Sequence, residues 1–104
     1  MTPFTLPSHP NMEFSKTVEG VSYFFHLCWF RGLMYATIED ATGAVLAQSV
    51  RCVNKKWLIP YPAYQKEEKG NFRFEDVNGE YPDYRNFGTT CTLCYYTAEE
   101  MSGM

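Results

Sequence analysis

Two cysteines three residues apart have the most obvious chemical potential in this 104-residue chain. Cys91 and Cys94 form a CxxC motif, which supports thiol redox chemistry at a helix N-terminus or zinc binding where a second Cys or His pair completes the ligands. Their Thr-rich, β-branched and aromatic neighbours predict a strand instead. Strand side chains three positions apart point to opposite faces. We therefore predict that both cysteines, like Cys28 and Cys52, are reduced packing residues, with a small zinc or thiol-redox protein as one alternative.

The other candidates for chemistry are two histidines and an acidic group. His26 lies in the middle of a predicted strand and His9 in an extended segment, and neither adjoins a nucleophile or carboxylate, so both are interpreted as structural. The acidic group surrounds the turn signal Asn78-Gly79 and consists of Glu75, Asp76, Glu80 and Asp83. Its spacing differs from an EF-hand loop, so calcium binding is a minor alternative. With no phosphate loop, HExxH or GxSxG motif, we expect no enzyme activity, no catalytic residues, no metal site and no cofactor.

Alternation of side chains predicts that strands position these residues. In residues 21–30, every second side chain is large and apolar, namely Tyr23, Phe25, Leu27 and Trp29. A repeat of two residues is the period of a strand. Trp29 is therefore predicted to lie in the core. The two-residue turn Arg31-Gly32 leads into a return strand over residues 33–39. Further strands are predicted over residues 12–18, 44–53 (with a bulge near residues 48–49), 71–77 and 89–97. The sequence thus predicts one all-β domain over residues 1–104, a small barrel or sandwich of about seven short antiparallel strands.

Proline-rich and aromatic segments outside these strands are the predicted contact sites. Residues 1–10 read as an extended arm in which Pro3, Pro7 and Pro10 block regular sheet pairing. Residues 57–60 are a short apolar segment before a loop over residues 61–70, and residues 98–104 form a short tail with at most one helical turn. Apolar side chains among prolines suit binding to another protein. The interface candidates are Phe4, Leu6, Trp57, Tyr61 and Tyr64.

Charge and targeting signals narrow the function further. The formal net charge is −3, which disfavours a protein held on nucleic acid by phosphate neutralisation. The first alternative function is nevertheless an OB-like barrel that binds single-stranded nucleic acid by stacking bases on the abundant aromatic rings. The N-terminus lacks a secretory signal and no apolar run is long enough for a membrane helix. We therefore expect synthesis in the cytoplasm, with no membrane partner and no specific nucleic acid.

The order of several short motifs resembles the small β-barrel plug proteins of bacteriophage tail baseplates. The similar features run from Pro10-Asn11-x-x-Phe14 through Leu27-x-Trp29 and Asp40-x-x-Gly43 to Gly70-x-Phe72 and Leu93-x-Tyr95. The resemblance implies a structural virion protein of the inner baseplate without catalytic residues. It also implies tail partners, namely the baseplate hub, the tail tube and further copies of the chain.

Overall fold

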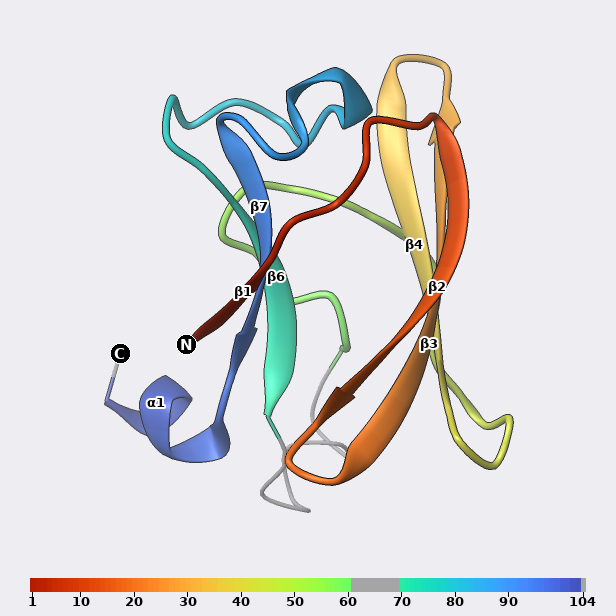
Figure 1. Ribbon diagram of the computed structural model, residues 1–104, viewed down its shortest axis with the longest axis vertical. Coiled ribbons are helices and arrows are strands. Elements are labelled where there is room, and N and C mark those ends of the chain that lie inside the picture. The colour runs from red at the N-terminus through yellow and green to blue at the C-terminus, as the bar shows by residue number, and fades with distance from the viewer. Residues whose placement is uncertain (61–69, 104) are drawn as a thin grey trace.

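The computed structural model describes residues 1–60 and 70–103, which form two facing antiparallel sheets (Figure 1). The first sheet has the order β1-β7-β6, with β1 at Thr2–Phe4, β7 at Cys91–Tyr96 and β6 at Asn71–Asp76. The second has the order β2-β3-β4-β5, with bounds Asn11–Val18, Val21–Phe30, Leu33–Asp40 and Val45–Arg51. A 3-10 helix, η2 (Tyr84–Asn86), and the helix α1 (Ala98–Ser102) complete the described elements. The all-β class is confirmed, but the two sheets do not close into a barrel.

Two tight turns make β2, β3 and β4 a regular meander. The turns consist of Glu19-Gly20 and Arg31-Gly32, and all four residues have positive φ. Positive φ at both central residues is the requirement of a type I′ turn, whose twist matches that of the flanking strands. Pairing therefore continues to the last residue before each turn, and the predicted hairpin is confirmed.

Strand β5 carries the predicted irregularity. Its register against β4 shifts between the partners of Ala36 and Ile38, and Ser49 has a φ of 46°. The intervening Thr37 accepts a hydrogen bond at its Oγ1 from the backbone N–H of Ser49 at 3.0 Å. A side chain thus replaces the lost ladder bond, as expected where a bulge leaves a residue unpaired.

The N-terminal arm differs from its prediction. Proline does not prevent pairing there, because β1 runs antiparallel to β7 with Pro3 opposite Cys94. An edge strand leaves alternate N–H groups without a ladder partner, so a residue that lacks this donor is tolerated. The seventh strand is therefore β1, and the short apolar segment before residue 60 forms no strand.

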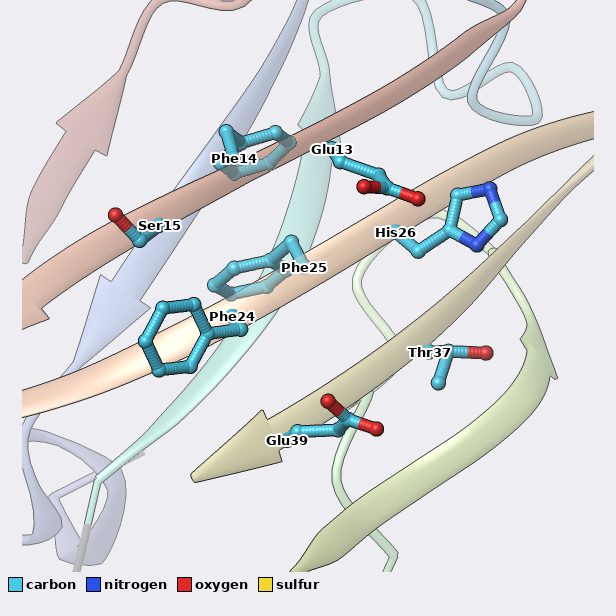
Figure 2. Close-up of a pocket in the computed structure, with 8 residues that line it drawn as sticks. All are labelled: Glu13, Phe14, Ser15, Phe24, Phe25, His26, Thr37 and Glu39. Carbon is cyan, nitrogen blue, oxygen red and sulfur yellow. The ribbon is translucent and has the colours of Figure 1, made fainter. Parts of the chain in front are cut away.

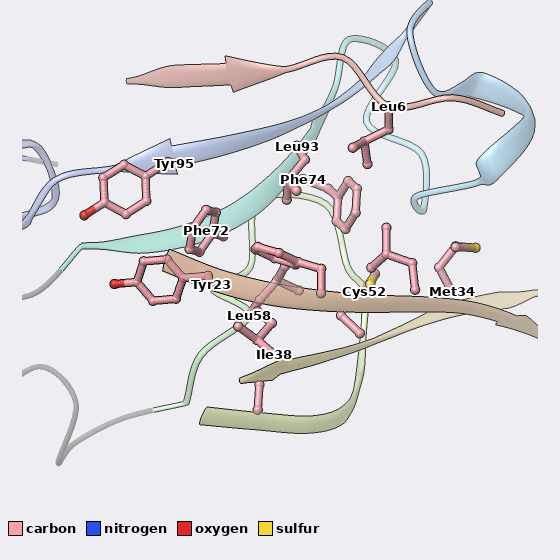
Figure 3. Packing of buried hydrophobic residues seen from close by; sticks show 14 of the residues in the cluster. Leu6, Tyr23, Met34, Ile38, Cys52, Leu58, Phe72, Phe74, Leu93 and Tyr95 are labelled. Carbon is pink, nitrogen blue, oxygen red and sulfur yellow. The ribbon is translucent and has the colours of Figure 1, made fainter. Parts of the chain in front are cut away.

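Aromatic rings from both sheets meet in the core (Figure 3). The ring of Phe72 lies 5.1 Å from that of Tyr23, 4.9 Å from that of Phe25 and 5.0 Å from that of Tyr95. The first two contacts join β6 to β3 across the interior in edge-to-face geometry, a favourable arrangement for aromatic pairs. Trp29 belongs to the same phase but is only half-buried, so the prediction that it is a core residue was too strong.

Candidate interaction surfaces

The CxxC motif lies within β7, and its two thiols are separated by the sheet. Cys91 belongs to the core cluster between the sheets, whereas Cys94 is buried outside that cluster. All four cysteines are free thiols. Burial raises the pKa of the Cys91 thiol to about 12, and burial likewise raises the pKa of Cys94. Because the thiolate is the reactive form, these groups are poorly suited to thiol exchange.

The acidic group is divided among local structural roles. The carboxylate of Asp76 accepts the backbone N–H of Asn78 at 2.7 Å and so closes the turn after β6. Asp83 accepts from the backbone N–H and the guanidinium of Arg85 at the start of η2. The side-chain hydrogen bond from Arg85 lowers the pKa of Asp83. These contacts explain Asp76 and Asp83 as a turn group and a cap group, while Glu75 pairs with the side chain of Arg73.

Neither a metal centre nor a membrane helix stands out in the described ranges. Within residues 1–60 and 70–103, no three His, Cys, Asp or Glu side chains are grouped so that they could hold a metal ion. The zinc alternative therefore has no ligand set in that part of the chain. Among the same residues, no helix has both the length and the apolar character needed to cross a membrane.

Two of the five interface candidates serve the chain's own fold. Leu6 is 5% exposed and belongs to the core cluster. Phe4 is partly buried, lies 6.3 Å from the Phe72 ring and is covered by the Lys16 ammonium at 5.1 Å. Pairing of β1 with β7 draws both side chains inward, so Leu6 is not accessible to a partner while β1 stays paired.

The other three candidates follow β5. Trp57 is half-buried, and its ring lies 5.3 Å from that of Tyr96 in a T-shaped contact. The guanidinium of Arg73 lies 4.7 Å from the centroid of each of these rings. Trp57 is thus fixed by neighbours and keeps part of its surface exposed. Tyr61 and Tyr64 lie outside the described residues.

The outward face of the four-stranded sheet holds an open hollow of about 550 Å³ (Figure 2). Two cross-strand rows of side chains line it, one of Glu13, His26 and Thr37 and the other of Ser15, Phe24 and Glu39. Figure 2 shows the Glu13 carboxylate extending toward the His26 ring. His26, interpreted from the sequence as a structural histidine, is instead exposed in this hollow. The rows bring an aromatic ring and two carboxylates together.

The exposed ring in this hollow was missed as a candidate, although a signal for it existed. Phe24 is 46% exposed and Phe30 is 55% exposed, and both lie in the phase of β3 opposite to the core residues. Large aromatic side chains in the outward phase of a strand indicate a surface that another molecule can cover. The two carboxylates beside Phe24 would repel phosphates, which weighs against the OB-like nucleic-acid alternative.

The described residues thus place the chain in the class of small all-β proteins built from two facing antiparallel sheets, with buried CxxC thiols and an exposed aromatic ring on the four-stranded sheet. Comparison with known families agrees with this class. The chain matches the family described as "Cyanophage baseplate Pam3 plug gp18" over residues 1–99. It therefore belongs to this phage baseplate plug family, as the ordered motifs indicated. No curated protein matches the chain.

Proposed function

We propose that the chain is a structural component of the phage tail baseplate, acting as a plug packed near the tail tube and hub. The family match over residues 1–99 is the observation that carries this proposal. The fold is consistent with it, because the described residues form the all-β domain expected for a packed structural part, with buried thiols and with Asp76 bound in a turn. Its partners are other tail proteins, its location is the tail of the virion, and its synthesis takes place in the host cytoplasm.

The location can be tested directly on purified particles. Mass spectrometry of intact virions and of isolated baseplates should find the chain in both, and cross-linking should join it to tube and hub proteins. A chain abundant in infected cells but absent from particles would contradict the proposal. Particles that assemble with normal baseplates after deletion of the gene would contradict a structural role.

Trp57 stays a proposed contact residue for this role, together with Tyr61 and Tyr64. Its half-exposed ring is held by Tyr96 and Arg73, so binding it costs little side-chain entropy. Replacing Trp57 by alanine should reduce cross-linking to the tail partner in particles that still contain the folded chain. Undiminished cross-links would remove Trp57 from the contact.

A further inference from the structure

Three of the four sheet edges formed by the described residues are guarded against pairing with another strand. Strand β1 has three residues and contains Pro3, and β5 is interrupted at Ser49. Residues 54–59 run along β6, where the N–H of Lys55 bonds to the carbonyl of Phe74 and that of Leu58 to the carbonyl of Phe72. Short edges, bulges and covering loops are devices by which proteins avoid unwanted edge pairing.

Strand β2 is the exception, with eight residues in unbroken register against β3. The N–H of Trp29 bonds to the carbonyl of Pro10 at 2.8 Å, which identifies the hydrogen-bonded pairs of this ladder. Because such pairs alternate in antiparallel sheets, the backbone groups of residues 12, 14, 16 and 18 face β3. Those of Asn11, Glu13, Ser15 and Thr17 face away from it, and all four residues are exposed.

The open edge adjoins the hollow of Figure 2. Glu13 and Ser15 supply both outward backbone groups and side chains that line the hollow. An added strand would continue the two rows, with one side chain beside Glu13 and another, two positions away, beside Ser15. The small Ser15 side chain leaves access to the Phe24 ring opposite it.

We propose that β2 accepts, by strand addition, an extended segment of a neighbouring baseplate protein that carries a lysine or arginine two positions from an apolar residue. The cation pairs with Glu13, and the apolar side chain packs over Ser15 against Phe24. Main-chain hydrogen bonds supply affinity in this mode, and alternate side chains supply specificity. The inference rests on the proposed baseplate function and adds the binding surface and the chemistry of the partner.

Charge complementarity argues for a different protein and against a second copy of this chain. The outward residues of β2 are Asn11, Glu13, Ser15 and Thr17, none of which carries a positive charge. Pairing two copies of β2 would offer Glu13 no cation and would bring acidic faces together. Sedimentation of the purified chain should therefore show a monomer, and a dimer that the substitution Ser15→Pro dissolves would overturn the assignment of the partner.

Hydrogen–deuterium exchange tests the edge in the intact chain and in isolated baseplates. Amides of peptides that cover residues 11–17 should exchange at least about tenfold more slowly in the baseplate, because a tenfold change corresponds to ~1.4 kcal/mol, about one hydrogen bond. Unchanged exchange there, in baseplates that contain the chain, would overturn the inference and leave the proposed function intact. Absence of the chain from baseplates would overturn both.

Two matched pairs of substitutions test separately the main-chain hydrogen bonds of β2 and the charge of Glu13. Ser15→Pro removes an outward N–H, whereas Ser15→Ala keeps it, so only the first should lower incorporation into baseplates by about tenfold or more. Glu13→Lys should lower incorporation, whereas Glu99→Lys makes the same charge change on α1 and should not. Thermal unfolding confirms that each variant folds before it is scored. Equal incorporation of the members of both pairs would contradict strand addition at β2.

Discussion

Replacing Asn71 by alanine tests how much one buried amide contributes to holding the end of the segment 54–59 against β6. Asn71 is fully buried at the start of β6. Its Oδ1 accepts the N–H of Ile59 at 3.1 Å, and its Nδ2 donates to the carbonyl of Ile59 at 2.9 Å. The side chain thus pairs with both backbone groups of Ile59, as a neighbouring strand would.

The cost follows from the groups that the substitution leaves behind. Ile59 is 1% exposed, so its N–H and carbonyl would lose their partner in a place that water does not reach. The N–H of the fully buried Phe72, which also donates to Asn71 Oδ1 at 2.7 Å, would lose its acceptor as well. An unsatisfied buried group costs about 1–3 kcal/mol, so with three such groups Asn71→Ala should destabilise the domain by at least about 3 kcal/mol. That is a large part of the ~5–15 kcal/mol typical of a domain.

Urea unfolding followed by tryptophan fluorescence measures this loss. The midpoint should fall while the slope against urea stays constant, which indicates a change in stability and not in the unfolded state. Asn11→Ala is the control, because Asn11 is exposed at the start of β2 and should change stability by less than about 0.5 kcal/mol. If Asn71→Ala lowers the free energy of unfolding by less than about 1 kcal/mol, the Ile59 backbone groups do not depend on the Asn71 side chain.

Asn71→Asp adds a pH test of the same site. The protonated carboxyl can accept from one Ile59 group and donate to the other, but the ionised carboxylate cannot donate. Burial raises the folded-state pKa of the introduced carboxyl above the unfolded value of about 3.9. The variant should therefore approach wild-type stability below about pH 3.9 and lose it as the pH rises through the raised pKa. A stability difference independent of pH would contradict this reasoning.

Three further predictions concern the half-buried tryptophan, the thiols and one ion pair. Trp29→Ala should cost about 1.5–3 kcal/mol in urea unfolding, below the ~3–5 kcal/mol of a full core site, because Trp29 packs at the rim against Tyr84. Burial raises the pKa of Cys91 to about 12, so at pH 8 its thiol should react with Ellman's reagent only in denaturant. Hydrogen bonding from Arg85 lowers the pKa of Asp83. The small loss of stability in Asp83→Asn should therefore be present at pH 7 and disappear as the pH falls below about 3.9 and through the lowered pKa.

The regular strands could be predicted because one local rule governs them. Alternation over residues 21–30 identifies which side chains face the core. The pair Arg31-Gly32, with positive φ at both residues, fixes where the chain turns. The opposite-face arrangement of Cys91 and Cys94 follows from the same period and is confirmed. Each of these features depends on residues close together in the chain.

Long-range pairing could not be predicted in the same way. The partner of β1 is β7, more than eighty residues away, and no local signal records that Pro3 faces Cys94. The half-burial of Trp29 depends on η2, which brings Tyr84 to within 5.3 Å of its ring centroid. The strand phase of Phe24 was visible in the sequence, but the hollow beside it required the register of β2 and β4.

The difference between the guarded sheet edges and the open edge of β2 fits the proposed role, in which the chain must avoid pairing with itself before it joins the baseplate. An exposed regular edge invites unwanted pairing with other strands, yet the edge of β2 is open along all eight residues of the strand. Glu13 on that edge and Glu39 across the hollow make self-pairing unfavourable, because a second copy brings carboxylates and no outward cation. A segment that carries a cation removes this repulsion and satisfies the edge in one step. On the proposal of strand addition at β2, the same acidic residues would oppose self-association before assembly and select the partner during it.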